Sequence, residues 1–285
     1  KIYPDVVFSK GGYPSVPVCA AARMLGIPVF VHESDTVPGR ANLFAGKFAV
    51  RIATSYPEAA ERFHVNEKKI ACVGNPMRKE LRVPIPDEAH VYFTLHKDMP
   101  TVLVLGGSQG AEHINNTVFG ALHDILPTHQ VIHQVGKANF AAYKQLVDVA
   151  LQDKPYAVNY RPVPYLSAME MVTAAGAANI IVSRAGSSSI FEIAQWEKPA
   201  ILVPIPEHVS RDQKENAYAY ARAGGCEVIE QKNFTPHVLV SEVRRVLGDA
   251  QAQTRMILGA RKFKRPNAAK EIAEEIIRIA LAHEK

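Results

Sequence analysis

Short apolar runs alternate with amphipathic stretches along almost the whole chain, and this alternation is the feature that most limits its fold. The runs have the length of buried strands, and the stretches between them have helical spacing. We predict strands at 6–8, 28–31, 50–54, 70–73, 101–105, 131–134, 156–160, 180–183 and 200–203, with helices at 16–25, 40–47, 143–151 and 213–221. Strands that alternate with helices build parallel sheets, so the predicted fold class is α/β.

The length of 285 residues fits two domains better than one. Residues 83–100 contain three prolines among charged residues and show little periodicity, which is typical of a linker. We therefore predict an N-terminal domain at 1–82, a linker at 83–100 and a C-terminal domain at 101–265. The last segment, 266–285, is predicted to be an amphipathic helix that packs back toward the N-terminal domain, with Ile272, Ile276 and Ile279 on one side.

Composition narrows the class of protein and of ligand. The three cysteines are far apart and form no Cys-x-x-Cys pair, which argues against a disulfide framework or a zinc knuckle and favours a reducing compartment. The net charge of +5 favours phosphate-bearing ligands or an anionic membrane surface. Aromatic residues do not alternate with the basic ones, so no nucleic-acid partner is predicted. No apolar run approaches the roughly 20 residues that span a bilayer.

Residues 183–192 form the most informative local pattern. An apolar run leads into a glycine turn and then a helix whose start carries Ser187, Ser188 and Ser189. The free N–H groups of a helix N-terminus bind anions, and Glu192, one turn further on, could accept hydrogen bonds from two sugar hydroxyls. This favours a nucleotide-sugar site. The alternative is that Ser189 and Glu192 form a capping box, which needs no ligand.

Two further segments have similar character. Residues 106–111 are glycine-rich and follow a predicted strand, so their N–H groups could hold a phosphate; the alternative is an ordinary strand-to-helix turn. The segment lacks the pattern of a dinucleotide fingerprint or of a P-loop. Asp212, Gln213 and Asn216 lie near one face of a predicted helix and could contact sugar hydroxyls, or could be an ordinary polar helix start.

The sequence gives no sign of a metal site. It contains no Asp-x-Asp pair, the usual carboxylate set for a cation bound to a nucleotide. His129 and His133 are four residues apart on a predicted strand, without a third ligand nearby. We predict neither a metal nor a cofactor.

Six short segments of the chain, including the three described above, together resemble the MurG family, the glycosyltransferases that add N-acetylglucosamine to the lipid-linked muramyl-pentapeptide of peptidoglycan. The matching stretches, in the family's order and with its spacing, are 11–13, 32–35, 74–78, 106–111, 183–192 and 213–217. The resemblance implies two Rossmann-like domains of the GT-B type that face each other across a cleft. It also implies an inverting, metal-independent transfer from UDP-N-acetylglucosamine, at the cytoplasmic face of the bacterial plasma membrane, to which the protein attaches peripherally.

The resemblance also implies roles for individual residues. Ser108 and its loop neighbours would hold the diphosphate, Arg78 would contact the UDP, and Glu192 would bind the ribose. Gln213 and Asn216 would contact the N-acetylglucosamine, and the stretch 165–168 corresponds to the uracil contact. The predicted substrate-binding residues are Asp35, Arg78, Gly107, Ser108, Gln109, Gly110, Ala168, Ser187, Ser188, Ser189, Ile190, Phe191, Glu192, Gln213 and Asn216. Asp35 and Asp212 stand where the family usually has uncharged side chains (Asp35 in place of Asn, Asp212 in place of Gln or His), which leaves the sugar specificity open.

The match to the family begins inside the fourth strand of its N-terminal domain. The family's first glycine-rich loop, with the histidine proposed as the general base, would lie upstream of Lys1, so we expect an N-terminally incomplete domain and assign no catalytic base. For His32 and Glu33 a role in ordering a loop is favoured. The activity of the chain by itself therefore stays open. The alternatives are another GT-B enzyme that acts on UDP-sugars, such as a non-hydrolysing epimerase, and a non-catalytic module that binds UDP-sugars.

Overall fold

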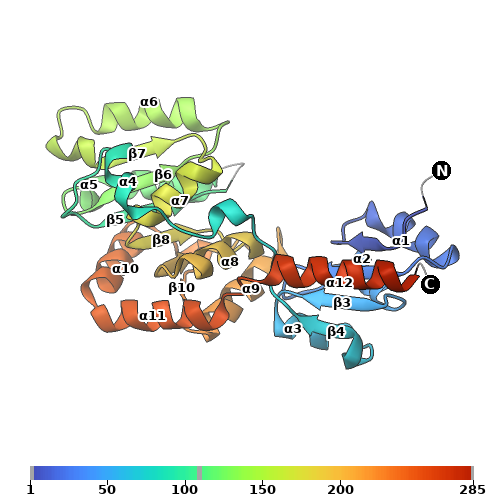
Figure 1. Ribbon diagram of the computed structural model, residues 1–285. Coiled ribbons are helices and arrows are strands. Elements are labelled where there is room, and N and C mark those ends of the chain that lie inside the picture. Colours follow the sequence, from blue (N-terminus) through green and yellow to red (C-terminus); the bar gives the residue numbers. More distant parts are fainter. Residues whose placement is uncertain (1–2, 108–110, 284–285) are drawn as a thin grey trace. The chain divides into compact units, whose positions relative to one another are not determined.

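The computed structural model describes residues 3–107 and 111–283, which divide into two compact α/β units (Figure 1). Unit 1 comprises Lys1–Met77 and Lys264–Lys285, and unit 2 comprises Arg78–Phe263. The predicted fold class is confirmed by the parallel sheet in each unit. The chain passes from one unit to the other between Met77 and Arg78 and again between Phe263 and Lys264. The sequence predicted that the N-terminal domain ends at residue 82 and the C-terminal domain at residue 265.

Unit 1 is built on a parallel sheet with strand order β1-β2-β3-β4. Its elements are β1 (Val7–Ser9), α1 (Ser15–Met24), β2 (Val29–Glu33), α2 (Arg40–Gly46), β3 (Arg51–Thr54), α3 (Pro57–Glu61), β4 (Ile70–Cys72) and α12 (Ala268–His283). Successive side chains of a strand point to opposite faces. Val29 and Val31 therefore pack with α1 and α2 on one face, whereas Phe30 packs with Ile272 and Ile279 of α12 on the other.

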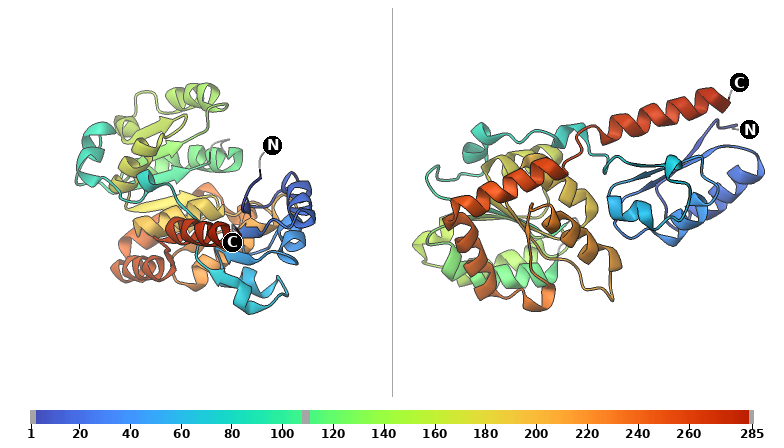
Figure 2. Two further views of the ribbon diagram at one scale, coloured as in Figure 1. Left: turned by 45° about the vertical axis from the view of Figure 1, so that its right-hand side comes forward. Right: turned by 90° about the horizontal axis from the view of Figure 1, so that it is seen from below.

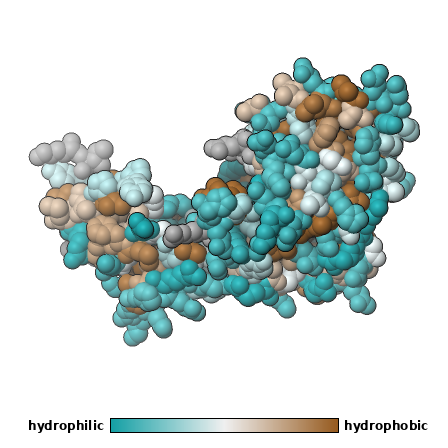
Figure 3. Space-filling view, turned by 180° about the vertical axis from the view of Figure 1, so that it is seen from behind, coloured by the Kyte–Doolittle hydropathy of each residue, from teal (hydrophilic) through white to brown (hydrophobic). Residues whose placement is uncertain are grey.

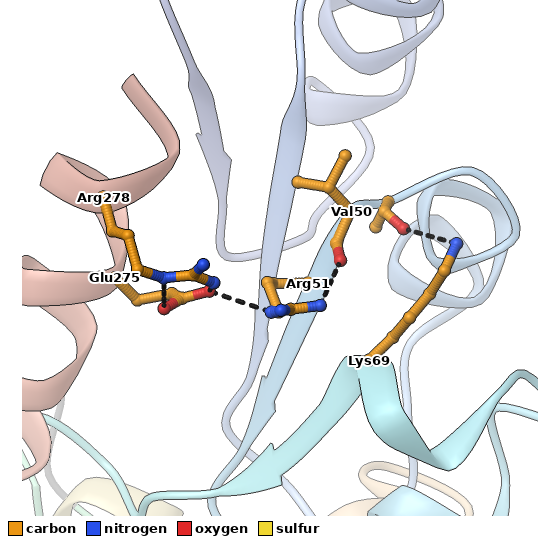
Figure 4. Close-up of polar contacts among 6 residues, drawn as sticks. Val50, Arg51, Lys69, Glu275 and Arg278 are labelled. Carbon is orange, nitrogen blue, oxygen red and sulfur yellow. Dashed lines mark hydrogen bonds and ion pairs between the residues drawn. The ribbon is translucent and has the colours of Figure 1, made fainter. Parts of the chain in front are cut away.

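Helix α12 is also attached to unit 1 through a shared carboxylate. Glu275 accepts a hydrogen bond from Nε of Arg51 on β3 at 3.0 Å, and it also pairs with Arg278 one turn along its own helix (Figure 4). The pKa of Glu275 is lowered, mainly by the hydrogen bond from Arg278. The apolar and ionic contacts together explain why the last segment of the chain belongs to unit 1.

Unit 2 holds a parallel sheet with strand order β10-β9-β8-β5-β6-β7, covered by helices on both faces (Figures 1 and 2). Its elements are α4 (Pro86–Tyr92), β5 (Thr101–Leu105), α5 (Glu112–Ile125), β6 (Gln130–Gln134), α6 (Phe140–Ala150), β7 (Tyr160–Val163), α7 (Ala168–Ala177), β8 (Ile180–Ser183), α8 (Ser187–Trp196), β9 (Ala200–Leu202), α9 (Arg211–Arg222), β10 (Glu227–Val228), α10 (Pro236–Gly248) and α11 (Ala250–Phe263). On β5, Val102 and Val104 face the core under α5 and α10, and Leu103 faces the core under α7 and α8.

The segment 83–100, which we predicted to be a linker, is part of unit 2. Pro86 opens helix α4, a position where proline is favoured because its missing N–H would have no partner there. Ala89 and Phe93 are buried with Leu103 in the core. The N–H of Ile85 donates to the carbonyl of Val172 at 3.1 Å. The prolines in this segment therefore start a packed helix where the sequence suggested an open connection.

The predicted strand at 156–160 also differs from the structure. Pro155–Asn159 form a short 3₁₀ helix, and β7 begins only at Tyr160. Pro162 lies within β7, which is an edge strand of the sheet and can therefore accommodate a residue that lacks an N–H. The short strand β10 was not predicted.

Helix α11 crosses the turn after α9 in direct backbone contact. A Cβ atom at Gly259 would lie 2.3 Å from the carbonyl carbon of Gly224 and 2.6 Å from the carbonyl oxygen of Ala223. Both neighbours are backbone atoms, which cannot move away without displacing the whole turn. A side chain at position 259 would therefore force the two elements apart.

We expect Gly259→Ala to lower the free energy of unfolding by about 1–3 kcal/mol or more, because overpacking against backbone is not relieved by a rotamer change. Urea unfolding followed by circular dichroism measures this. Gly248→Ala is the matched control, since a Cβ there meets no atom within 4 Å and alanine favours the helix. A Gly259→Ala protein as stable as the control would contradict the close crossing.

Candidate functional site

The strand order of unit 2 creates a point where two loops leave the sheet side by side. From β5 the chain builds outward to β6 and β7, and then returns to the other side of β5 with β8, β9 and β10. Ligands of open α/β sheets bind at such a reversal, beyond the carboxyl ends of the strands. Leu105 at the end of β5 pairs in register with Ser183 at the end of β8. The two predicted phosphate loops therefore start next to each other.

The loop after β5 is anchored to the neighbouring strand β6. Nε2 of Gln134 donates to the carbonyl of Gly107 at 3.0 Å, and the N–H of Gly106 donates to the carbonyl of Gln134 at 3.4 Å. Gly107 has a φ of +79°, in the left-handed region that favours glycine. The predicted contacts Ser108, Gln109 and Gly110 lie outside the described residues.

The loop after β8 leads directly into helix α8. Gly186 is its N-cap and makes no side-chain cap bond, so the first N–H groups of the helix are not capped by that residue. Ser189 is the third residue of the helix and Glu192 the sixth, so the capping-box alternative is excluded by their positions. Ser187 is buried and Ser188 is exposed. The serines thus lie at a helix start, a kind of backbone position that favours anions.

Helical geometry separates the predicted residues of α8 into two groups. Ile190 is fully buried in the core, and Phe191 packs on Phe263 with ring centroids 5.0 Å apart. Neither side chain is available to a ligand, although both were predicted to contact the donor. Glu192 is half-buried, and among the described residues it takes part in no hydrogen bond or ion pair.

The environment of Glu192 alters its acidity. Burial raises its pKa to about 7, and the positive charge of Arg78 partly opposes this shift. The carboxyl oxygens are free to accept hydrogen bonds from a ligand. A carboxylate with unused acceptors in a partly buried position is a candidate for a functional group.

Gln213 on α9 connects the loops that follow two neighbouring strands. Its Oε1 accepts hydrogen bonds from the N–H of Ala185 at 3.2 Å and from the N–H of Ile205 at 3.3 Å. Its carbonyl oxygen is therefore committed to the protein, and only its amide nitrogen can serve a ligand. Asn216, one turn later, is fully buried.

The stretch 165–168 forms the entry to α7. Ser167 and Glu170 make a true capping box: the N–H of Glu170 donates to Oγ of Ser167, and the N–H of Ser167 donates to the Glu170 carboxylate at 2.7 Å. Ala168 is the first residue of the helix. Sequence reasoning missed Lys137, whose ammonium lies 4.9 Å from the ring centroid of Tyr165. The sequence signal that could have indicated Lys137 is its position shortly after β6 and directly after Gly136, at the carboxyl end of a strand.

Unit 1 carries a separate polar cluster at the carboxyl end of β2. The Glu33 carboxylate accepts hydrogen bonds from the N–H groups of Asp35 and Gly39, each at 3.0 Å, and from Nδ2 of Asn42 at 2.8 Å. Burial raises the pKa of Glu33.

His32, the residue before Glu33, is also held in place. Its Nε2 is 3.0 Å from the carbonyl oxygen of Gly74, and burial lowers the His32 pKa to about 4. These contacts fit the predicted loop-ordering role of both residues. Asp35 lies in this loop, in the other unit from Glu192.

Among residues 3–107 and 111–283, no group of three or more His, Cys, Asp and Glu side chains is placed to hold a metal ion. Within the same residues, every helix is too short or too polar to cross a bilayer.

Comparisons with known proteins agree with this architecture. Residues 101–272 match the glycosyltransferase family 28 C-terminal domain, and residues 1–54 match the family's N-terminal domain. The structure is similar to the crystal structure of MurG from Acinetobacter baumannii, with a TM-score of 0.74 and 26% identity, over 96% of this chain and 73% of that one.

Relatives with curated names belong to the same family. A Treponema denticola protein named UDP-N-acetylglucosamine–N-acetylmuramyl-(pentapeptide) pyrophosphoryl-undecaprenol N-acetylglucosamine transferase is 37% identical over 86% of this chain; the match spans 63% of that relative's length. A Bacillus cereus protein has the same name followed by the number 2. It is 33% identical to this chain, and the match covers 97% of this chain and 74% of the Bacillus cereus protein. The chain belongs to glycosyltransferase family 28 and, within it, to the MurG family.

Proposed function

We propose that this chain transfers N-acetylglucosamine from UDP-N-acetylglucosamine to a lipid-linked muramyl-pentapeptide, with inversion at the anomeric carbon and without a metal ion. The observation that supports the proposal is the pairing of Leu105 with Ser183, because the glycine-rich loop after β5 and the loop before α8 start beside each other there. The half-buried Glu192, with its free acceptors, lies one turn into that helix. Phosphate donors and a ribose acceptor on one sheet edge suit a nucleoside diphosphate sugar.

The residues of unit 2 take distinct parts of the donor in this proposal. The backbone of the loop 106–111 and the start of α8 bind the diphosphate, and Arg78 adds a positive charge near Glu192. The Glu192 carboxylate accepts the ribose hydroxyls. The amide nitrogen of Gln213 contacts the sugar, and Asn216 supports it from within α9. The uracil lies near the start of α7, and Asp212 influences the choice of sugar; Asp35, which belongs to unit 1, is proposed to influence it as well.

The transfer itself is a single displacement. The acceptor hydroxyl oxygen bonds to the anomeric carbon as the bond from that carbon to the β-phosphate oxygen breaks. The electron pair of the broken bond leaves with UDP, and the hydroxyl proton passes to a general base that we do not assign to a residue of this chain. Preorganised N–H groups and cations stabilise the charge that develops on the diphosphate.

A lipid-linked acceptor requires the protein to approach a membrane, and we propose peripheral attachment at its cytoplasmic face. The surface seen in Figure 3 is mostly hydrophilic with scattered hydrophobic areas. In unit 1, Met24 and Leu25 at the end of α1 are 87% and 74% exposed. Beside them Arg23, Arg51 and Arg278 line an open cavity of about 490 Å³. Exposed apolar side chains beside cations suit an anionic lipid surface.

Glu192→Ala should weaken UDP binding by about 100-fold, because two hydrogen bonds to a charged acceptor are lost. Isothermal titration calorimetry with UDP measures this. Glu242→Ala, which removes a surface glutamate paired with Arg245 on α10, is the matched control and should bind like the unchanged protein. Equal UDP affinities for the two variants would exclude the ribose role of Glu192.

The raised pKa of Glu192 predicts the direction of the pH dependence. Below about pH 7 the unliganded carboxyl group is protonated, whereas the bound ribose requires the ionised form, so binding must release a proton there. UDP affinity should therefore fall as the pH drops below about 7, and should level off above it. The same pH profile measured with Glu192→Gln contains the titration of UDP but not that of Glu192, so the difference between the two profiles reports on Glu192. A pH profile with the same slope in both proteins would contradict the assignment.

Incubation with UDP-N-acetylglucosamine and the lipid-linked muramyl-pentapeptide should give the disaccharide lipid and UDP, at a rate that excess EDTA leaves unchanged. Mass spectrometry of the lipid product and proton NMR of the nucleotide sugar follow the reaction, because epimeric sugars have the same mass. An epimerase would instead change the sugar of UDP-N-acetylglucosamine without acceptor. Binding of UDP-N-acetylglucosamine without either product would indicate a binding module, and loss of turnover in EDTA would exclude the metal-independent mechanism.

Membrane attachment can be tested at α1. Substitution of both Met24 and Leu25 by Glu should reduce sedimentation with vesicles rich in phosphatidylglycerol, because it removes apolar contact and adds negative charge. Val149→Glu on α6, where the valine is 74% exposed, serves as the control and should sediment like the unchanged protein. If the α1 variant sediments as well as the control, this surface is not the attachment site.

A further inference from the structure

Trp196, the only tryptophan of the chain, is the last residue of α8 and holds the segment with which unit 2 begins. Its side chain is 4% exposed and packs in the core under α7 and α8. Its Nε1 donates to the carbonyl of Leu81 at 2.6 Å, and Leu81 is 1% exposed. Nε2 of Gln195 donates to the next carbonyl, that of Arg82, at 3.4 Å. Two neighbouring side chains of α8 therefore hold two neighbouring backbone carbonyls.

The segment that Trp196 holds is directly connected to Arg78. Arg78 is the first residue of unit 2 and the N-cap of the short 3₁₀ helix Lys79–Leu81. The N–H of Leu81 donates to the Arg78 carbonyl at 3.1 Å, so Leu81 joins Arg78 to Trp196 through its two backbone groups. A single 3₁₀ turn is not stable by itself. Its position therefore depends on the groups that hold it.

Helix α8 relates this contact to Glu192. Residues four positions apart lie on the same side of a helix, so Trp196 follows Glu192 one turn further along α8. The positive charge of Arg78 acts on the Glu192 carboxyl group and partly opposes the rise of its pKa. Arg78 is exposed, so its backbone, more than packing of its side chain, determines where the guanidinium can reach. One side of α8 thus carries Glu192 and also the group that holds the backbone next to Arg78.

An indole contributes packing and one hydrogen-bond donor, and these two contributions can be separated. A phenylalanine would fill much of the same core volume, but it has no N–H to reach the Leu81 carbonyl. A buried carbonyl that loses its donor is unfavourable and favours a rearrangement of the turn that carries it. The hydrogen bond is therefore the part of Trp196 that fixes the 3₁₀ helix.

We propose that Trp196 is a positioning residue for donor binding. Through its hydrogen bond to Leu81 it holds the 3₁₀ helix that begins at Arg78, and so keeps the Arg78 guanidinium where it contacts the charged part of UDP. The inference rests on the proposed function, in which Arg78 contributes to UDP binding. Trp196 acts through Arg78 and makes no contact with the donor. Fixing Arg78 before the ligand arrives reduces the entropy that binding costs.

The experiment is a double-mutant cycle measured by calorimetric titration with UDP and with uridine. The proteins are the unchanged chain, Trp196→Phe, Arg78→Met and the variant with both substitutions. We expect Trp196→Phe to weaken UDP binding by about 3- to 10-fold, the effect of one hydrogen bond, and to leave uridine binding unchanged because uridine carries no phosphate. With Met at position 78, the substitution of Trp196 should cause no further loss, since the group that it positions is absent.

Tyr156→Phe is the matched control. It also removes one hydrogen bond of an aromatic side chain in unit 2, the contact of the Tyr156 hydroxyl with Nδ1 of His123 at 3.0 Å. Tyr156 packs against the other core of the unit, under α5 and α10. This variant should bind UDP and uridine like the unchanged protein.

The outcomes separate this inference from the proposed function. If the unchanged protein does not bind UDP, the proposed function fails. If it binds UDP and Trp196→Phe binds UDP equally well, the proposed function stands and the positioning role fails. The role also fails if Trp196→Phe loses UDP affinity by the same factor with and without Arg78, or if UDP and uridine lose affinity equally, because Trp196 would then have a general structural effect.

A second measurement needs no substitution of Trp196. Because the chain has one tryptophan, its intrinsic fluorescence reports on Trp196 alone. Saturating UDP should shift the emission of the unchanged protein and of Tyr156→Phe, and the shift should be lost in Arg78→Met. An equal response of the unchanged protein and Arg78→Met, including no response in either, would overturn the link between Trp196 and Arg78 even if Trp196→Phe does not fold.

Discussion

The parallel pairing of β5 with β8 is the constraint on which the candidate site depends. Leu105 and Ser183 are partners in this register, although 78 positions separate them in the sequence. Both strands are buried on both faces, so a shift by one residue would turn every core side chain to the wrong layer. The register therefore fixes which loop residues emerge together. The glycine-rich loop after β5 and the loop that leads into α8 start as neighbours as a consequence of the hydrophobic packing beneath them.

Partial burial determines the chemistry of this edge. Glu192 is half-buried, and its pKa is shifted in the direction that favours its neutral form. In an environment of low dielectric, a charge that lacks a partner is unfavourable and a charge that finds one is strongly stabilised. The site thus holds a carboxylate that gains most when a ligand supplies hydroxyl donors. Gln213 supports this edge indirectly, because its carbonyl oxygen ties the loops after β8 and β9 to α9.

Much of the fold could be predicted from local pattern, and the differences have specific causes. Apolar runs such as 101–105 and 180–183 predicted strands where strands occur, since an uninterrupted apolar run is what a doubly covered parallel strand requires. Prolines caused both larger errors. Pro86 starts a helix within what was predicted to be a linker, and Pro155 starts a 3₁₀ helix where a strand was predicted. Proline excludes some conformations, but it does not say which of the remaining ones packing selects.

The sequence by itself determined the class of fold, the family and the segments that carry polar chemistry, because these depend on periodicity and on residue types at short spacing. Only the tertiary structure decided which side chains of those segments can meet a ligand. Ile190 and Phe191 proved to be core residues, Gln213 proved to hold backbone amides, and Trp196 proved to hold the backbone of Leu81. The reason is physical: exposure, pKa and unsatisfied hydrogen bonds depend on neighbours that are distant in sequence, and the hydrophobic core sets those neighbours.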